Sequence, residues 1–424
     1  MTSTDTTASK RPDLLSGDGA RILIFAVLAS GLTGPGQTIG VSVFIDPFID
    51  ELGITRSEVS SAYLVGTLIA SLFLPSVGRF IDRHGVRRSQ AVIGVVFAAA
   101  LVNMSFVTGL VTLAIGFIGI RLLGQGSLSL VSTVTVSLRF DEDRGTALGL
   151  FSTFSAGLLA LAPIGLGLAI SAWGWRTAWL AAAVFILITV VPMAWFGLAS
   201  MPRGSRSSKA AADEIHDTSV TNSEAVTRSE ALTRSEAVTR SQAVRTRGFW
   251  ILVAIGGSTS MLSTALNFHQ IDLLTTAGLS TTAAAALFLP QVIGSSLAGF
   301  GFGVLCDRLE GPWLPAAAAG LLGVSLLLAA VVSPGVIVFV YAIVLGAAGG
   351  ASRTVTSALL AKWFGTEEIG SIQGTLTTTN VGLSAIGPVT LAVLESSTGS
   401  YATSTLILAL IPAGAVVFAF SGPR

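Results

Sequence analysis

Apolar residues along the chain fall into twelve runs of about 20 residues, separated by shorter polar stretches. An α-helix rises ~1.5 Å per residue, so a run of this length crosses the ~30 Å hydrocarbon core of a bilayer. The runs predicted to be helices are 21–46, 58–78, 89–107, 111–138, 146–172, 177–199, 248–270, 281–304, 313–332, 335–361, 371–394 and 401–420. The pattern therefore predicts an all-α membrane protein with twelve transmembrane helices.

The composition excludes several other classes of protein. The 424 residues are 51% hydrophobic and 11% charged, whereas soluble domains have roughly 25% charged residues. A single cysteine excludes a disulfide framework and a cysteine-rich zinc site, and three scattered histidines cannot build a metal site or a catalytic triad. A net charge of +1 argues against nucleic-acid binding. We therefore expect no enzymatic activity and no cofactor, with a small-molecule substrate and the lipid bilayer as partners.

Basic residues are distributed unevenly between the two sides of the predicted membrane. With the N-terminus inside, 20 of the 24 Lys and Arg lie on the cytoplasmic side, and only Arg56 and Arg176 lie outside. This asymmetry follows the positive-inside rule. We expect both ends to be cytoplasmic, with residues 1–20 as a tail that lacks the order of a signal peptide and residues 421–424 as a second short tail. The expected location is a bacterial inner (plasma) membrane, and the expected functional unit is a monomer.

Residues 200–247 form the one long polar segment between spans, and they divide the spans six and six. The segment holds a hexapeptide array that starts at Ser223, in which each Glu precedes an Arg by four residues, a spacing that supports a solvated helix. A period of six does not keep apolar residues on one helical face, so the array is a poor packing surface. We interpret the segment as a flexible or partly helical cytoplasmic linker, with a partner-docking helix as the alternative.

The two six-span halves are internal copies of each other. Asp82 and Arg83 of the first half recur in the second half as Asp307 and Arg308. The separation between Asp82 and Asp307, here called the repeat offset, is kept by Gly53/Gly278, Gly124/Gly349, Gly145/Gly370, Gly149/Gly374, Gly157/Gly382 and Pro163/Pro388. Duplicated spans around a central linker are typical of secondary transporters, which bind substrate near the midplane between the repeats. We expect two pseudo-symmetric six-helix bundles, at 21–199 and 248–420.

The stretch from Gly78 to Arg88 (GRFIDRHGVRR) resembles the signature loop between spans two and three of the major facilitator superfamily. Its degenerate copy at Gly303 to Gly311 lies where that family has its second copy, so the resemblance covers both halves and implies the major facilitator fold. It also implies a cytoplasmic gate that is latched while the cavity faces outward. The gate residues are Gly78, Asp82, Arg83, Gly85, Arg87, Arg88, Asp307 and Arg308, with Asp141, Glu142, Asp143, Glu367 and Glu368 as expected partners. The alternative role of the Arg cluster is membrane orientation alone.

Two arginines lie within predicted spans. Arg121, in the sequence Arg121-Leu-Leu-Gly124, looks like the family's Arg-plus-Gly motif on span four. A charge at mid-membrane costs at least ~2.5 kcal/mol, so Arg121 should face a cavity. It either holds a substrate carboxylate, or takes part in proton coupling, or bonds span-one carbonyls. Arg353 in span ten either lines the substrate path or snorkels to the interface.

Isolated polar residues complete the candidate site. Gln37, Tyr63, Asn267 and Asn380 lie at membrane depth and either line the cavity or bond neighbouring helices. Gly34-Pro35-Gly36 is predicted to break span one, as substrate-binding helices often require.

Candidates for proton coupling are fewer, because no Asp or Glu lies in the core of a predicted span. They are His269, which closes predicted span seven, and the outer pair Asp46 and Asp272. The alternative for His269 is a purely interfacial position.

The predicted function is a secondary active transporter that moves a small organic anion, such as a monocarboxylate or dicarboxylate, by alternating access with proton coupling or exchange. The residues of span one and of the gate loop loosely resemble those of the oxalate/formate and monocarboxylate branch of the family. That branch usually carries basic residues in spans eight and eleven, which have no charged residue here. A proton-coupled drug or metabolite exporter is the first alternative. A non-transporting membrane receptor or scaffold is the second.

Overall fold

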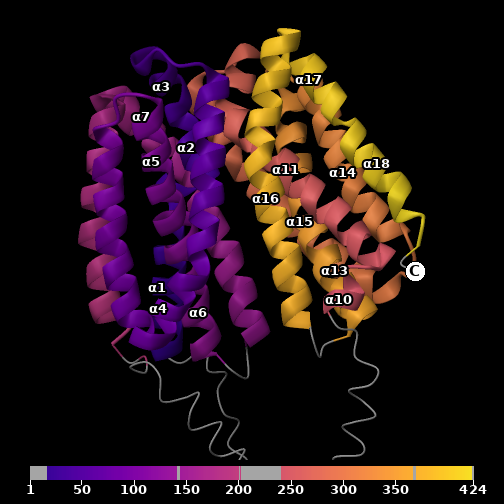
Figure 1. Cartoon of the computed structure of the whole chain (residues 1–424), viewed down its shortest axis with the longest axis horizontal. Coiled ribbons are helices and arrows are strands. Elements are labelled where there is room, and N and C mark those ends of the chain that lie inside the picture. Colours follow the sequence, from indigo (N-terminus) through magenta and orange to yellow (C-terminus); the bar gives the residue numbers. More distant parts are fainter. Residues whose placement is uncertain (1–16, 141–143, 200, 202–239, 366–368, 423–424) are drawn as a thin grey trace, which may run out of the picture.

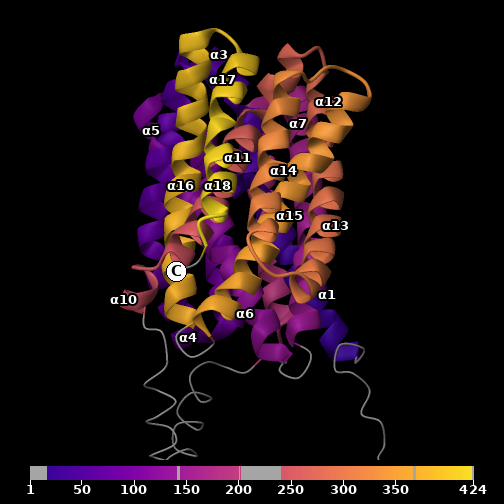
Figure 2. The same ribbon diagram turned by 90° about the vertical axis from the view of Figure 1, so that its right-hand side faces the viewer.

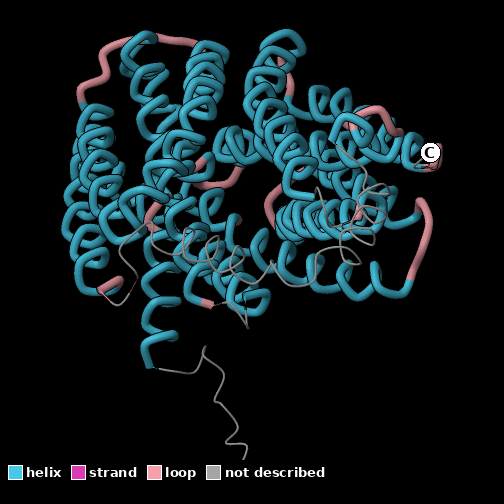
Figure 3. The backbone as a smooth tube through the Cα atoms, turned by 60° about the horizontal axis from the view of Figure 1, so that its bottom comes forward, coloured by secondary structure: helices cyan, strands magenta, loops and turns pink. Residues whose placement is uncertain are grey.

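The computed structural model describes residues 17–140, 144–199, 201, 240–365 and 369–422. Every regular element in these residues is a helix, and short loops connect them (Figure 3). The helices that precede the linker form one bundle, and those that follow it form a second bundle alongside (Figure 1). The predicted all-α architecture of two bundles is confirmed.

The first bundle contains spans one to six. Span one consists of α1 (Gly17–Gly31), η2 (Gly34–Gly36), α2 (Thr38–Val41), η3 (Ser42–Phe44) and α3 (Ile45–Leu52). The rest of this bundle consists of α4 (Arg56–Ser105), α5 (Leu110–Ile120), the π-helix η4 (Arg121–Leu128), α6 (Ser129–Arg139), α7 (Arg144–Pro192) and the π-helix η5 (Met193–Gly197).

The second bundle contains spans seven to twelve and begins with a short helix. Its elements are α10 (Arg240–Ala243), α11 (Arg247–Thr276), α12 (Thr281–Ala286), α13 (Phe288–Arg308), α14 (Trp313–Ala330), α15 (Val336–Phe364), α16 (Ile369–Thr398), α17 (Tyr401–Leu408) and α18 (Leu410–Ala419). The hexapeptide array lies outside the described residues except for its last part, part of which forms α10.

Two of the helices each contain two spans. Ten helical stretches in the described residues are long and apolar enough to cross a membrane, and α4 alone has 50 residues. A 50-residue helix is ~75 Å long, more than twice the ~30 Å apolar core. The chain reverses at Gly85 (φ 76°, ψ 158°) in α4 and at Gly174 (φ 77°, ψ 160°) in α7. Adding these two spans to the ten gives the twelve that the sequence predicts.

The predicted loop from Gly78 to Arg88 is shorter than expected, because helix continues on both sides of Gly85. A left-handed φ is accessible to glycine without the steric cost that a Cβ brings, so one residue suffices for the reversal. Gly78 and Asp82 therefore lie on the last turns of span two, and Arg87 and Arg88 on the first turn of span three.

Corresponding helix starts and turns in the two bundles are also separated by the repeat offset. It separates Arg56, where α4 begins, from Thr281, where α12 begins. It likewise separates Gly53 from Gly278, which both have positive φ, of 64° and 99°, and Gly174 from Gly399, with 77° and 67°. The internal repeat inferred from glycines and charges thus reappears as a repeat of helix starts and turns.

The helix of span one is interrupted as predicted, and the interruption packs closely on the backbone of span four. A Cβ on Gly36 would lie 2.4 Å from the carbonyl oxygen of Ile120 and 3.0 Å from the Cα of Gly124. Only a residue without a side chain allows this approach of two backbones. The contact places the Gly36 carbonyl beside Arg121, at the start of the π-helix η4.

The bundles have two ends that the figures distinguish. At the linker end, α6 finishes and α10 begins, while α3, α12 and α17 lie at the opposite end, here called the distal end (Figures 1 and 2). Across the two bundles α4 packs on α16, and α11 contacts η3.

Candidate functional site

A polar cavity of about 350 Å³ lies within the second bundle. Three helices line it: α11, α15 and α16. The lining residues are Gly256, Thr259, Ser260, Ser263, Thr264, Asn267, Gly349, Ser352, Arg353, Thr356, Ser357, Gln373, Leu376 and Asn380. Three of the residues predicted to bind substrate, Asn267, Arg353 and Asn380, are therefore brought together on one cavity.

The polar residues reach the cavity because they form a stripe on each helix. On α11 the polar lining residues recur at 259/260, 263/264 and 267, with the i, i+3/i+4 spacing of one helical face. On α15 the lining positions are 349, 352/353 and 356/357. Because the surrounding lipid gains nothing from a polar face, such stripes belong inside a transmembrane bundle.

Several polar atoms on this cavity have no hydrogen-bond partner in the described protein. They are Thr259 Oγ1, Ser263 Oγ, Asn267 Oδ1, Thr356 Oγ1 and Asn380 Oδ1. A buried polar group without a partner costs about 1–3 kcal/mol, so water or a solute must satisfy these atoms. The cavity is built to hold a polar occupant.

Arg353 is the one charged residue among the described residues that line the cavity. Its Nη2 donates a hydrogen bond to Ser295 Oγ on α13, at 2.6 Å. It forms no salt bridge with any carboxylate in the described part of the chain, and its side chain is solvent-accessible. The guanidinium thus retains donors for an occupant of the cavity, and the cavity carries a positive charge.

Arg121 lies in the first bundle in a different environment. It is 5% exposed, and it donates from Nε to Thr67 Oγ1 at 3.1 Å and from Nη1 to the Gly36 carbonyl at 3.3 Å. Its guanidinium lies 4.6 Å from the centre of the Tyr63 ring, a cation–π distance. These contacts match the alternative in which Arg121 bonds a span-one carbonyl and links spans one, two and four.

Tyr63 and Gln37 also form hydrogen bonds with side chains of the first bundle. The Tyr63 hydroxyl and Thr38 Oγ1 share a hydrogen bond of 2.6 Å, and Tyr63 is fully buried. Gln37 Nε2 donates to Thr33 Oγ1 at 3.0 Å. The Tyr63 ring also lies 4.7 Å from that of Phe268 in the second bundle, so Tyr63 contacts the neighbour of Asn267 across the bundle interface.

At the distal end, a charged network joins the bundles. Arg56 Nη2 lies 2.6 Å from Asp46 Oδ1 and 3.1 Å from Asp272 Oδ1, and the Tyr401 hydroxyl donates to Asp272. Asp46 and Arg56 belong to the first bundle, and Asp272 and Tyr401 to the second. The two acids predicted for proton coupling are thus bridged by one arginine.

A second distal network stays within the first bundle. Arg176 donates from Nε to Glu51 Oε1 at 2.9 Å, and the Trp175 indole donates to the other oxygen of Glu51 at 2.5 Å. Arg176 and Tyr401 are separated by the repeat offset, so corresponding positions in the two bundles each bond an acid at the distal end of the bundle's first span.

His269 lies inside span seven rather than at its end. The predicted end at 270 is too early, because α11 continues to Thr276. The ring is fully buried, its Nε2 donates to the Pro388 carbonyl of α16 at 2.9 Å, and its Nδ1 has no partner. His269 is therefore a buried side chain that tethers two helices of the second bundle.

The predicted gate residues at the linker end make few contacts among the described residues. Asp82, Arg83, Arg88, Asp307 and Arg308 are exposed, and none forms an ion pair within the described part of the chain. Arg87 lies 4.7 Å from the Trp195 ring, where its guanidinium makes a cation–π contact. The acids expected as partners, Asp141 to Asp143 and Glu367 to Glu368, lie outside the described residues.

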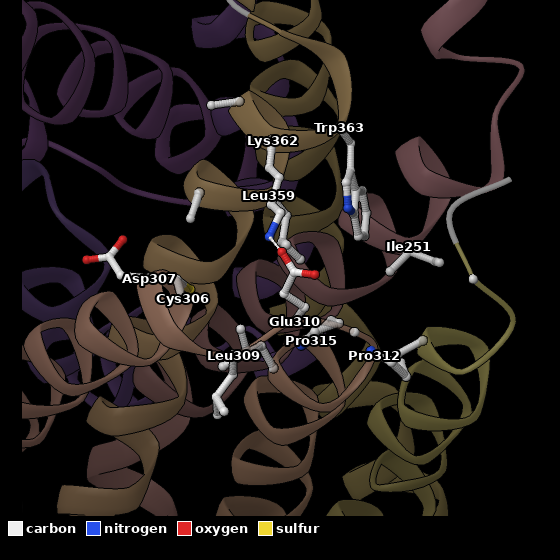
Figure 4. A pocket seen from close by; sticks show the side chains of 16 residues that line it. Ile251, Cys306, Asp307, Leu309, Glu310, Pro312, Pro315, Leu359, Lys362 and Trp363 are labelled. Carbon is white, nitrogen blue, oxygen red and sulfur yellow. Dashed lines mark hydrogen bonds and ion pairs between the residues drawn. The ribbon is translucent and has the colours of Figure 1, made fainter.

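A larger cavity, of about 660 Å³, opens at the linker end of the second bundle (Figure 4). Lys362 reaches Glu310 across it at 2.6 Å, while Asp307 points away from this pair (Figure 4). The hydrogen bond from Lys362 lowers the pKa of Glu310. Because its one lining cation, Lys362, is paired with Glu310, this cavity lacks the unpaired cation of the α11–α15–α16 cavity.

Sequence reasoning missed several residues that the structure places at these sites. Thr259, Ser263 and Thr356 were not singled out, although their spacing along one helical face is visible in the sequence. Arg56 was noted only as one of two outer basic residues. Its pairing could have been suspected, because the outer acids Asp46 and Asp272 have only Arg56 and Arg176 as basic residues on their side.

The fold and the cavity together define a polytopic membrane transporter. The sequence profile of the Major Facilitator Superfamily matches residues 24–313, which is more than half of the chain. The chain therefore belongs to the Major Facilitator Superfamily, and it is a transporter rather than an enzyme.

Individual similarities are more distant. The chain is 28% identical to the MFS antiporter QDR3 of Candida albicans over 177 residues, which is 40% of this chain and 25% of that protein, so it spans a quarter of that relative's length. Among solved structures, a bacterial homologue of the human lysosomal transporter Spinster, in an inward-facing and unoccupied conformation, has a TM-score of 0.71 at 15% identity, with 96% and 97% of the two chains covered. The nucleoside transporter NupG, in a mutant form, has a TM-score of 0.70 at 15% identity, with 94% and 98% covered.

Proposed function

We propose that this protein is a secondary active transporter for a small organic anion, such as a monocarboxylate or dicarboxylate, which binds in the α11–α15–α16 cavity. The observation that carries the proposal is the guanidinium of Arg353, which lines a polar cavity with no carboxylate to neutralise it in the described residues. A carboxylate fits a guanidinium with two parallel hydrogen bonds. A cationic solute would meet repulsion there.

Alternating access follows from the asymmetry between the two ends. At the distal end, Arg56 holds Asp46 and Asp272 together across the bundles, and Tyr63 packs on Phe268. At the linker end, five of the predicted gate residues are exposed: Asp82, Arg83, Arg88, Asp307 and Arg308. We assign this arrangement to the state that is closed at the distal end and open at the linker end, with rocking around the cavity as the transport step. Both termini and the linker are assigned to the cytoplasm by the excess of Lys and Arg at that end.

The coupling of anion transport to protons, or to the exchange of another solute, is assigned to residues at the distal end. His269 and Asp272 lie one helical turn apart on α11, and Asp272 shares Arg56 with Asp46. Protonation of an acid in this bridge would weaken its attraction for Arg56 and so favour separation of the bundles. The MFS antiporter QDR3, which matches part of the chain, supports exchange as the second form of coupling. The cavity lies within one chain, which supports a functional monomer.

Flux measurements in liposomes test the proposal. Purified protein should take up at least one of the labelled carboxylates lactate, oxalate and gluconate saturably and faster with an inward proton gradient, and a cationic dye should not move. The Arg353→Gln variant should lose most of the uptake. The Arg245→Gln variant removes an exposed charge at the linker end and should transport normally. Dye efflux without any anion flux would favour the exporter alternative instead.

A further inference from the structure

We infer that the transported anion carries several hydroxyl groups in addition to its carboxylate, as in a sugar acid, and that a plain alkyl carboxylate is a poor substrate. This inference rests on the proposed function, because it specifies which anions the α11–α15–α16 cavity accepts. The juxtaposition that carries it is one unneutralised guanidinium beside two nearly buried threonine hydroxyls that have no protein partner.

The number of unmatched polar groups exceeds what a carboxylate alone can use. A carboxylate offers two oxygens, which Arg353 can engage with its guanidinium. Thr259 Oγ1, Thr356 Oγ1 and Ser263 Oγ then still lack partners. Thr259 and Thr356 are each 6% exposed, so bulk water has little access to them. An occupant that displaces the water must supply their hydrogen bonds itself.

The chemistry of the unmatched atoms points to hydroxyl groups in particular. Asn267 and Asn380 each present an amide oxygen without a donor, and an amide oxygen only accepts hydrogen bonds. Threonine and serine hydroxyls both donate and accept. A solute hydroxyl serves both kinds of partner, whereas an alkyl chain serves neither and leaves them unpaired.

The alternative donor, an ammonium group, is disfavoured by charge. Among the described residues, the cavity lining contains Arg353 and no Asp or Glu. A cationic amine would therefore be desolvated beside a like charge, with no counter-ion on the lining. Hydroxyl groups supply the donors that the amide oxygens need without adding positive charge.

The group around Arg121 in the first bundle is bonded within the protein and does not offer a comparable set of free groups. The guanidinium of Arg121 donates to Thr67, Thr38 and the Gly36 carbonyl, and the Tyr63 hydroxyl bonds Thr38. In this state, discrimination between solutes is therefore assigned to the second bundle.

Two six-carbon monocarboxylates test the inference, since gluconate carries hydroxyl groups and hexanoate does not. Saturable uptake into liposomes is measured for both labelled acids with wild-type protein and with Thr259→Val and Thr356→Val. Thr390→Val is the matched control, because Thr390 lies on α16 away from the cavity and bonds its own helix at Ile386. Thermal melting of each variant in detergent, with and without gluconate, checks folding and reports binding independently of transport.

Wild-type protein should prefer gluconate by at least about tenfold in kcat/KM, because a site built to bond hydroxyl groups rejects analogues that lack them. Thr259→Val and Thr356→Val should each lower the ratio of kcat/KM for gluconate to that for hexanoate, and each should reduce the rise in melting temperature that gluconate causes. Thr390→Val should leave the ratio and the rise in melting temperature unchanged. Equal uptake of hexanoate, or a preference unaffected by both valine variants, would overturn the inference while anion transport stands. Absence of flux and of thermal stabilisation with either acid would overturn both proposals.

Discussion

Arg56 lies 3.1 Å from Asp272 and thereby joins the start of span two to the distal end of span seven, across the two bundles. The same guanidinium nitrogen lies 2.6 Å from Asp46 at the distal end of span one. Both side chains of the cross-bundle pair are mostly buried, with 18% and 23% of their side-chain surface exposed. Since the bundles must separate at this end for alternating access, the Arg56 bridge is an interaction that transport has to break.

The first prediction concerns the Arg56→Gln variant. Charge-assisted hydrogen bonds contribute about 1.5–3 kcal/mol, and 1.4 kcal/mol corresponds to about tenfold in an equilibrium. Arg56→Gln should therefore increase the population open at the distal end by about tenfold or more. Spin labels at exposed Asp50 and Thr281, in a Cys306→Ser background, should report a longer distance between the bundles.

Arg176→Gln is the matched control for this experiment. It removes the same charge from the same end of the molecule, but its partner Glu51 lies in its own bundle. The distance between the labels should therefore stay unchanged in Arg176→Gln. An equal lengthening in both variants would mean that loss of positive charge, and not the cross-bundle bridge, controls the distal end.

The sequence predicts the scaffold well, since the scaffold follows from local patterns. The length of the apolar runs predicts the twelve spans, and the repeat offset predicts the two bundles. The sequence Gly34-Pro35-Gly36 predicts the break in span one. Each of these features depends on residues within one helix or turn, or on their recurrence along the chain. The placement of Asn267, Arg353 and Asn380 on one cavity also follows, because polar residues of a transmembrane helix turn inward.

The sequence predicts less well which polar and charged side chains contact each other. Which carboxylate Arg56 meets depends on how two helix ends from different bundles approach, and no local pattern encodes that distance. Serine and threonine in transmembrane helices usually bond their own backbone, as Thr390 does, so a single Thr259 carries no signal by itself. Only the recurrence of such residues along α11 distinguishes a cavity face.

The second prediction separates the roles of the two membrane-embedded arginines. Arg353 has donors free for a solute, so Arg353→Gln should raise KM for the anion by about tenfold or more, with little change in thermal stability. Arg121 bonds three helical segments, so Arg121→Gln should lower the melting temperature. Transport kinetics and melting curves on the same preparations check both expectations. A rise in KM for Arg121→Gln at unchanged stability would contradict this division.

The third prediction concerns His269, whose Nε2 donates to the Pro388 carbonyl. His269→Gln offers an amide that can still donate but does not titrate near neutral pH. If His269 carries the coupled proton, this variant should retain exchange of internal for external anion and lose acceleration by an inward proton gradient. Exchange and gradient-driven uptake are measured in the same liposomes. If the proton gradient still accelerates anion uptake by the variant, His269 only tethers α11 to α16. The coupled proton would then be assigned to Asp46 and Asp272.

The fourth prediction tests the backbone contact between spans one and four. A Cβ on Gly36 would lie 2.4 Å from the Ile120 carbonyl oxygen, a distance that requires one of the two backbones to move. Overpacking of this kind costs about 1–3 kcal/mol, so Gly36→Ala should lower the melting temperature and weaken transport by displacing the acceptor of Arg121. Gly149→Ala on α7 is the control, since nothing lies within 4 Å of its added Cβ. In a helix interior alanine is favoured over glycine by roughly 0.5–1 kcal/mol, so Gly149→Ala should leave stability unchanged or raise it. Equal tolerance of alanine at both positions would show that the close approach at Gly36 is not needed to hold span one against Arg121.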